Sequence, residues 1–139
     1  MTTPTAPIEA ALALLYRPGD VVELRVPKAG KYKTISGYYT EHSTLASDAA
    51  KMSGKFPGIY VTLNPCEPAL FARAANRAKP YAEATTADNQ IVERRWLLCD
   101  LDWERPAGIS TTDTEHQAAI ALAYKMRDDL YLDGWPSPV

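Results

Sequence analysis

Cysteine and histidine are scarce in this sequence. Its 139 residues include two cysteines, Cys66 and Cys99, and two histidines. Two cysteines cannot supply a disulfide framework, and neither they nor the histidines form a zinc ligand set. The absence of such a framework favours a reducing environment, and we expect the protein to be cytoplasmic.

Long apolar runs and a large net charge are also absent. The apolar stretch near the start contains Glu9, has no basic region before it, and is shorter than the ~18 residues of a membrane span. We therefore expect neither a signal peptide nor a membrane helix. The net charge of −2 excludes a general positive field, so binding to nucleic acid would depend on local clusters of arginine and lysine.

Two frequent catalytic patterns are missing as well. The chain has no glycine-rich loop of the kind that holds phosphates, and no serine, cysteine and histidine set for nucleophilic catalysis. What remains is an ordinary globular composition, with 46% hydrophobic and 23% charged residues in a length typical of one domain. Such a chain can bury a modest core.

Hydrophobic periodicity and turn residues predict helices that alternate with strands, and hence an α/β or α+β layered domain rather than a helical bundle. The first expected elements are a helix over 6–17, strands over 21–26 and 34–40 as a hairpin around a basic turn, and a helix over 42–52. They are followed by a strand over 58–64, a helix from Pro68 to about residue 77, a polar loop over 79–90, a strand over 94–102 and a helix over 112–132.

The final helix has the clearest boundaries. Thr112 and Glu115 form a capping box at its start, and Gly134 favours its end. The sequence stops after this helix and its turn, where an alternating fold would add its next strand. We therefore expect the last sheet to have an unpaired edge, through which two copies of the chain would associate. One face of the helix is apolar and consists of Ala119, Leu122, Met126 and Leu130.

Two aspartates lie at the end of the expected strand over 94–102. Alternate residues of a strand point to the same side, so Asp100 and Asp102 would share a face with their Cα atoms about 7 Å apart. Carboxylates at this spacing suit divalent cations such as magnesium or manganese, which neutralise triphosphate charge and activate the attacking hydroxyl in phosphoryl transfer. The alternative is a solvated pair at a strand end, with Glu104 and Arg105 as salt-bridge partners.

Several segments occur in an order that extends over most of the chain. They are SGYY at 36–39, GIYVTLNPCEPALFARAANRA at 58–78, RRWLLCDLDWERPAGISTTDTEHQAA at 94–119 and GWPSP at 134–138. Together they resemble the N-terminal part of bifunctional DNA primase-polymerase domains of the archaeo-eukaryotic primase superfamily, found in phage, plasmid and integrated-element replication proteins. This ordered co-occurrence is more specific than the acidic pair alone.

The resemblance implies a fold and an activity. In that family an N-terminal α/β unit, here residues 1 to about 90, precedes a unit similar to an RNA-recognition-motif fold, here begun by residues 91–139. Asp100 and Asp102 match the family's hydrophobic-Asp-hydrophobic-Asp motif, which implies that they are catalytic ligands of Mg²⁺ or Mn²⁺. The implied function is template-directed nucleotidyl transfer in the DNA replication of a mobile element, with DNA template, primer and nucleotides as partners.

The resemblance also implies what is missing. The family's second motif, a small residue and a histidine two positions on, would follow GWPSP, and its third motif supplies another aspartate, but this sequence contains neither. His42 and His116 fit structural or solvent-exposed roles instead, and Trp103 stands where many relatives have proline. The implied protein is a truncated or split domain whose partner is either a helicase or its missing C-terminal half.

Four further residues are candidates for contact with a nucleotide or nucleic acid. Asn64 ends the strand over 58–64, where it would either cap the following turn or face a nucleotide. Arg73, Asn76 and Arg77, together with Lys79, would make a basic end of the next helix. There they would either contact template phosphates or be favourable side chains near a helix C-terminus.

A mixture of lysines and tyrosines lies close by in residues 28–39. Such a mixture can hold a single strand by charge and base stacking, whereas tyrosines at strand positions are otherwise half-buried packing residues. The residues are Lys28, Lys31, Lys33, Tyr32, Tyr38 and Tyr39.

Two functional hypotheses follow from the sequence. The first is the N-terminal portion of a primase-polymerase, with a metal half-site at Asp100 and Asp102. The second is a non-catalytic remnant or split subunit that binds single-stranded DNA or a replication partner.

Overall fold

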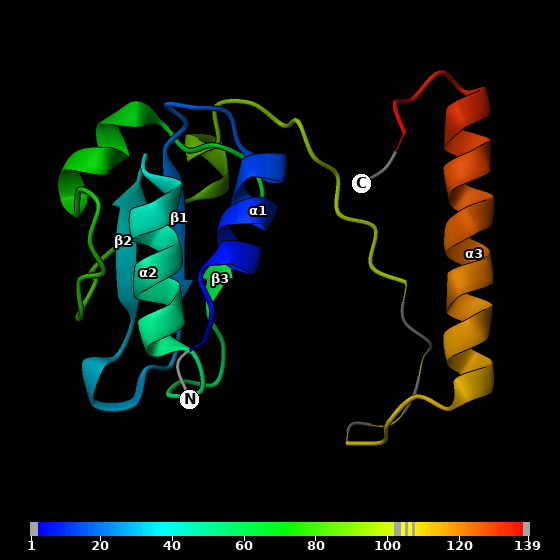
Figure 1. Cartoon of the computed structure of the whole chain (residues 1–139), viewed down its shortest axis with the longest axis horizontal. Helices are drawn as coiled ribbons and strands as arrows, with labels where there is room; N and C mark the ends of the chain where they lie inside the picture. The colour runs from blue at the N-terminus through cyan, green and yellow to red at the C-terminus, as the bar shows by residue number, and fades with distance from the viewer. Residues whose placement is uncertain (1–2, 102–103, 105, 107, 138–139) are drawn as a thin grey trace. The chain divides into compact units, whose positions relative to one another are not determined.

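The structure is a computed structural model that describes residues 3–101, 104, 106 and 108–137 (Figure 1). Within those residues it has a mixed α+β architecture, with three α-helices and a three-stranded antiparallel sheet. This confirms the α+β class expected from the sequence. The chain divides into two compact units, Met1–Leu97 and Leu98–Val139.

The sheet lies in the first unit and has β1 (Val22–Val26) at its centre. β2 (Ile35–Tyr39) pairs with one side of β1 and β3 (Tyr60–Val61) with the other. β1 and β2 are antiparallel and joined by a turn that contains the 3-10 helix Gly30–Tyr32, so the expected hairpin is confirmed. Successive residues of each strand point to opposite faces, and the two faces carry different side chains.

β3 is much shorter than the strand expected over residues 58–64. It pairs with β1 only at Leu24 and Arg25. Beyond these, the hydroxyl of Thr62 takes the place of a backbone carbonyl and accepts the N–H of Glu23 at 3.2 Å. The ladder therefore ends after two residues.

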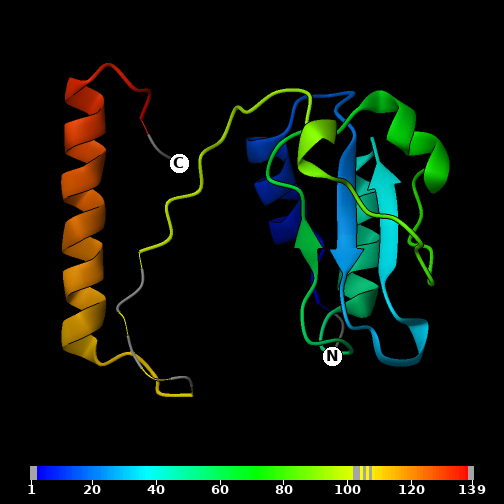
Figure 2. The ribbon, with the colours of Figure 1, turned by 180° about the vertical axis from the view of Figure 1, so that it is seen from behind.

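Two helices cover one face of the sheet, as Figures 1 and 2 show. α1 (Ala6–Leu15) and α2 (His42–Met52) confirm the two helices expected there, although α1 ends earlier than residue 17. Each large apolar side chain buried in this layer contributes about 1.5–3 kcal/mol. The buried residues between helices and sheet are Leu12, Tyr16, Val22, Leu24, Val26, Ala29, Ile35, Tyr39, Leu45 and Ala46.

The opposite face of the sheet is covered by irregular chain. In Figure 2 the segment between residues 82 and 91, which includes the 3-10 helix Asp88–Gln90, crosses in front of the strands. Glu23 and Ser36 point to this face and are buried. A smaller apolar cluster lies beside them and consists of Val21, Tyr38, Cys66 and Leu70.

The chain after β3 forms a 3-10 helix, η2 (Pro68–Arg73), where a longer helix to about residue 77 was expected. The helix ends early because residues 74–79 pair with the outer edge of β2 instead. Ser36 and Lys79 exchange two backbone hydrogen bonds, of 3.0 and 2.9 Å. Gly37 allows this close approach, since a Cβ there would collide with a backbone carbonyl of the neighbouring segment.

Residues 94–101 form no strand, so the strand expected over 94–102 is wrong for the part that the structure describes. Leu97 and Leu98 are 68% and 75% exposed. An apolar run becomes a strand only where a neighbouring strand accepts and donates its backbone hydrogen bonds, and no described strand does so here. The expected unpaired edge of a second sheet consequently has no counterpart among the described residues.

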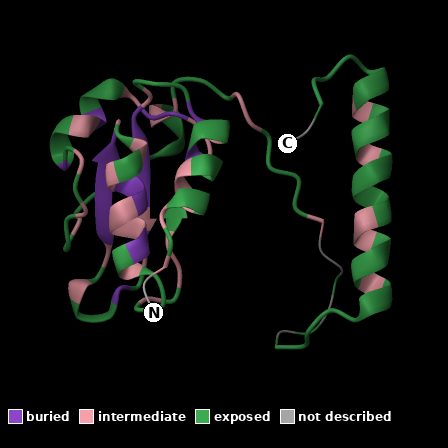
Figure 3. Cartoon of the chain, in the orientation of Figure 1, coloured by how far each residue is buried: buried purple, intermediate pink, exposed green. Residues whose placement is uncertain are grey.

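The second unit contains α3 (Asp113–Leu132), which confirms the expected final helix. Its capping box is also confirmed, because the Thr112 hydroxyl accepts the Glu115 N–H at 3.3 Å and the Glu115 carboxylate accepts the Thr112 N–H at 2.8 Å. No residue of α3 is buried within its own unit, as Figure 3 shows. Among the described helices, none has the length and apolar character needed to cross a bilayer.

Candidate functional site

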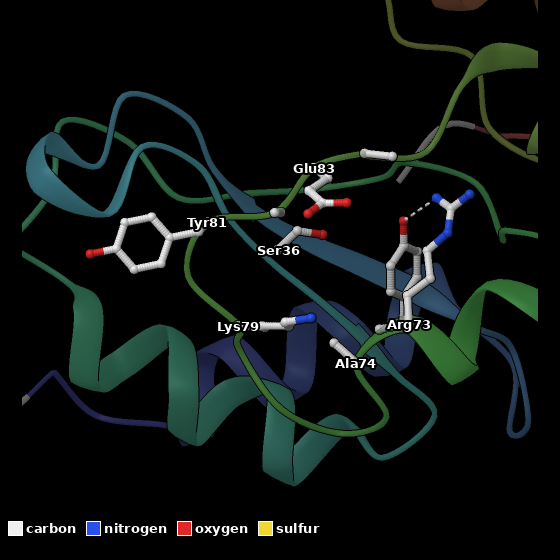
Figure 4. A pocket seen from close by; sticks show the side chains of 9 residues that line it. Ser36, Arg73, Ala74, Lys79, Tyr81 and Glu83 are labelled. Carbon is white, nitrogen blue, oxygen red and sulfur yellow. Dashed lines mark hydrogen bonds between the residues drawn. The ribbon is translucent and has the colours of Figure 1, made fainter.

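A shallow cavity opens on the sheet face that α1 and α2 leave uncovered. Its volume is roughly 310 Å³, at the lower end of the ~300–1,000 Å³ typical of small-ligand pockets. Figure 4 shows the side chains of Arg73, Lys79 and Glu83 around the cavity, with Ser36 on the sheet beside them. The ring of Tyr81 also belongs to the lining but points away from the other side chains.

Backbone hydrogen bonds to the sheet fix the walls of this cavity. Residues 74–79 are paired with β2, as described above. The N–H of Tyr81 then donates to the carbonyl of Tyr32 at 3.1 Å, which ties the next residues to the turn between β1 and β2. Arg73 and Lys79 therefore reach the cavity from a segment that is bonded to the sheet along its length.

A buried carboxylate is bonded to the floor of the cavity. Glu23 has no exposed surface, and it accepts hydrogen bonds from Ser36 at 2.5 Å, Arg25 at 2.6 Å and the backbone N–H of Thr86 at 2.9 Å. Burial raises the pKa of Glu23, but these hydrogen bonds together outweigh burial and bring the pKa below its ordinary value of 4.5. The carboxylate is therefore ionised, paired with Arg25, and acts as a support for the cavity floor.

The hydroxyl of Tyr38 connects this buried network to the cavity wall. Its oxygen accepts hydrogen bonds from Nη1 of Arg73 and from the hydroxyl of Thr86, each at 3.3 Å. Tyr38 is 1% exposed, so its position is set by the packing of the sheet. The position of Nη1 of Arg73 is therefore set by a buried residue of the sheet.

Arg73 and Lys79 have hydrogen-bond donors to spare. A guanidinium carries five N–H donors and an ammonium carries three, and Arg73 uses one of them on Tyr38. Among the residues that the structure describes, no carboxylate lies within 4.0 Å of either side-chain cation. Glu83 lines the same cavity but pairs with neither of them. Each cation therefore has donors available for a phosphate or carboxylate oxygen.

Of the residues expected to contact nucleic acid near η2, the structure places Arg73 and Lys79 at the cavity. Asn76 lies in a left-handed turn, where its side-chain oxygen accepts the N–H of Thr40 at 3.0 Å and its amide donates to Glu41 at 3.1 Å. Arg77 is exposed and does not line the cavity. The basic helix end expected from the sequence is not formed, because η2 ends at Arg73.

Asn64 holds a distant part of the chain. Its side-chain oxygen accepts the N–H groups of Arg95 at 2.7 Å and Trp96 at 2.8 Å, and its amide donates to the Trp96 carbonyl at 3.0 Å. Arg95 is also paired with Asp20 at 2.6 Å, and the Trp96 indole N–H donates to the carbonyl of Leu15 at 2.7 Å. The polar atoms of Asn64 are thus engaged by backbone, and a nucleotide contact there stays a prediction.

Of the carboxylate pair, Asp100 is exposed, whereas Asp102 lies outside the described residues. Their shared face therefore stays a prediction. Carboxylate oxygen is the donor that Mg²⁺ and Mn²⁺ prefer, so the chemistry of Asp100 fits such an ion. Within the described ranges no three His, Cys, Asp or Glu side chains are grouped closely enough to hold a metal.

The tyrosines near the basic turn divide into buried and accessible ones. Tyr38 and Tyr39 are each 1% exposed, which confirms the packing alternative for both. Tyr32 is half-buried and meets the exposed Tyr81 edge-on, with ring centroids 6.3 Å apart. The ammonium of Lys31 lies 5.1 Å from the centroid of the Tyr32 ring.

The two histidines take structural or exposed positions, as expected. His42 is the first residue of α2, and its ring lies 6.1 Å from that of Tyr16. His116 is exposed in the first turn of α3. Neither lies at the cavity.

No family model, curated protein or solved structure matches the chain. Its function is therefore argued from its own residues and contacts. Sequence analysis missed Ser36, Tyr81 and Glu83 as members of the cavity. The signal that was available is the polar pair Glu23 and Ser36, which lie at positions of adjacent strands that share one face. Nothing in the sequence indicates that the chain after η2 returns along β2.

Proposed function

We propose that the chain is the N-terminal portion of a primase-polymerase, a metal-dependent enzyme that performs template-directed nucleotidyl transfer in the DNA replication of a mobile element. One contact carries the proposal. The segments that resemble this family, residues 58–78 and 94–119, are separate in the sequence, yet Asn64 binds the backbone of Arg95 and Trp96 through three hydrogen bonds. The ordered resemblance is thus accompanied by a direct link between the two segments in space.

In this function Asp100 and Asp102 hold a divalent cation. Such an ion neutralises triphosphate charge and activates the attacking hydroxyl. The three hydrogen bonds between Asn64 and the backbone of Arg95 and Trp96 fix the chain just before the segment that contains both aspartates. The remaining metal ligands and the groups that hold the triphosphate would come from the C-terminal half of the domain or from a partner chain.

Manganese binding by the full chain tests the metal half-site. We expect Mn²⁺, followed by its electron paramagnetic resonance signal, to bind at least about tenfold more weakly when Asp100→Asn and Asp102→Asn are combined, because both ionised ligands are lost. The matched control combines Asp128→Asn and Asp129→Asn, which remove the same charge from exposed positions of α3. Equal affinity in all three proteins would contradict the half-site.

Primer extension separates this function from the alternative. A non-catalytic module that binds single-stranded DNA or a replication partner is favoured by the lack of a three-ligand group in the described part of the chain. The assay pairs the chain with the C-terminal half or partner chain that completes the metal site. Extension of a primed template in Mn²⁺ by that pair, abolished by Asp100→Asn in this chain, would support the polymerase. Template binding by the pair without extension would support the module.

A further inference from the structure

We propose that the cavity between Arg73 and Lys79 binds a backbone phosphate of a single nucleic-acid strand, and that Tyr81 stacks on an adjoining base. The inference deepens the proposed function and rests on it for the identity of the polymer. Its residues, however, all belong to the first unit and are independent of Asp100 and Asp102.

Positive charge is concentrated around this cavity. The chain as a whole has a net charge of −2, but residues 26–40 contain three lysines and no acidic residue. Residues 68–82 contain Arg73, Arg77 and Lys79 and likewise no acidic residue. The two stretches lie side by side because residues 74–79 pair with β2. A local positive surface on an acidic protein attracts a polyanion to that surface in particular.

Arg73 and Lys79 both present hydrogen-bond donors to this cavity. The hydroxyl of Tyr38 holds one N–H of Arg73 at 3.3 Å and leaves the rest of the guanidinium free to form a fork to two phosphate oxygens. Lys79 adds a compact charge whose donors have no acceptor among the described residues. The backbone that carries both residues is already ordered by β2, so binding does not have to order it.

The negative charge of Glu83 favours a nucleic-acid strand over a free triphosphate as the ligand of this cavity. Its carboxylate lines the same cavity and repels the dense charge of a triphosphate more strongly than the single charge of a backbone phosphate. The positive residues also continue beyond the cavity into the turn at 28–33, where Lys31 lies against Tyr32. Charges that are spread along a surface match the spacing of phosphates along a strand.

Tyr81 provides the stacking face. It is 54% exposed, and its ring is directed away from the other lining side chains in Figure 4, so it lies beside the phosphate cavity rather than inside it. Its backbone has φ of 56°, a conformation uncommon for a bulky residue, and the hydrogen bond to Tyr32 maintains it. Because every base has a stacking face, this contact tolerates any sequence.

Fluorescence anisotropy of labelled oligothymidine with the full chain in EDTA tests the phosphate contact. We expect Arg73→Gln and Lys79→Gln each to weaken binding about tenfold at low salt, because each removes a charged donor. The combined variant should lower the salt slope by roughly 0.7, the value for one phosphate. Glu83→Gln should tighten binding. Lys51→Gln is the matched control, since it removes the same charge as Lys79→Gln from α2 on the other face.

Two further experiments test the stacking contact and distinguish a strand phosphate from a free nucleotide. Tyr81→Ala should weaken binding of oligothymidine about tenfold, Tyr81→Phe should not, and an abasic strand should not distinguish these proteins. Thymidine triphosphate is the competing ligand. The triphosphate could displace the strand at similar concentrations and bind Tyr81→Ala as tightly as the wild type. In that case the cavity is a nucleotide site, and the proposal that it binds a strand is wrong.

Failure of this inference differs from failure of the proposed function. Mn²⁺ affinity that does not change in the combined Asp100→Asn and Asp102→Asn variant would contradict the proposed function, whereas the strand measurements in EDTA test only this inference. Thermal melting by circular dichroism identifies any variant that does not fold. Glu83→Gln is informative in addition, because it should raise strand affinity, and misfolding would not produce an increase. Equal strand affinity of the wild type and the folded Arg73→Gln, Lys79→Gln double variant would overturn the phosphate site.

Discussion

Glu23 is a charged side chain in the middle of the sheet with no exposed surface. Removing a carboxylate from water is costly, and it is tolerated here because Ser36, Thr86 and Arg25 all donate to its oxygens. The three donors come from β2, from the crossing chain and from β1 itself. Glu23 therefore fastens the irregular layer to the sheet, and it supports the cavity through Ser36.

Substitution of this carboxylate should have a measurable cost. We expect Glu23→Gln to lower the free energy of unfolding by about 2 kcal/mol at neutral pH, because hydrogen bonds to a charged acceptor are lost and Arg25 is left without its partner. Urea unfolding followed by tryptophan fluorescence measures the difference. Ser36→Ala, which removes one of the donors, should cost less.

The contribution of Glu23 should also depend on pH. Its pKa lies below the ordinary 4.5 in the folded chain, so its stabilisation is complete above that value and is lost as the pH falls below it. The difference in unfolding free energy between wild type and Glu23→Gln should be constant above about pH 5.5 and shrink as the solution is acidified. A difference that stays constant down to about pH 3 would show that the carboxylate gains nothing from these bonds.

At the scale of elements, the pairing of residues 74–79 with β2 depends on Gly37. A Cβ at this position would meet the carbonyl oxygen of Arg77, so Gly37→Ala must push the two segments apart. We expect a loss of about 1–3 kcal/mol in stability and faster hydrogen exchange at the amides of Ser36 and Lys79. Gly54→Ala is the comparison, because Gly54 has open space around it and only its φ of 73° opposes a side chain. Unchanged exchange in Gly37→Ala would contradict the close approach.

The elements that the sequence predicted well are those fixed by neighbouring residues. α1, α2 and α3 follow local apolar spacing, and the capping box of α3 needs only Thr112 and Glu115. The β1–β2 hairpin likewise joins adjacent segments. These features require no knowledge of the rest of the chain.

The elements that the sequence predicted badly depend on distant partners. η2 is short because the chain after it pairs with β2, and β3 is short because the Thr62 hydroxyl replaces a ladder carbonyl. The run at 94–101 has strand-forming residues but no described strand beside it. Hydrophobic periodicity predicts which residues of a segment are buried. It does not predict which other segment will supply the backbone hydrogen bonds that a strand needs.

The candidate site shows the same division. Arg73 could be proposed from the sequence because its charge is visible in any fold. The engagement of Asn64 and Asn76 by the backbone could not, because each bonds residues roughly 30 or more positions away. Tyr81 and Glu83 were read as part of a polar loop, since only the return of the chain along β2 brings them to Arg73.

At the scale of the whole molecule, the chain divides into two units between Leu97 and Leu98. Trp96 is held by the carbonyl of Leu15 and by Asn64, whereas the next two side chains are largely exposed. Backbone that is exposed and without regular structure is the preferred place for proteolysis. The first unit should therefore withstand a protease that removes the second.

Limited digestion with chymotrypsin checks this division. We expect early cleavage after Leu97 or Leu98 and accumulation of a fragment that ends there, identified by intact-mass spectrometry. Asn64→Ala releases the backbone of residues 95–96 and should move the accessible region toward the first unit. First cuts within β1 or α2 would contradict an independently stable first unit.

The backbone of Tyr81 has a further consequence for anyone who engineers this protein. Its left-handed conformation costs about 1–2 kcal/mol in a residue with a side chain, and glycine would avoid most of that cost. A stabilisation campaign that ranks positions by backbone strain would therefore choose Tyr81→Gly early. The glycine variant would be more stable when unbound but would lack the ring on which a base stacks. Tyr81 thus lowers the stability of the free protein and raises its affinity for a strand.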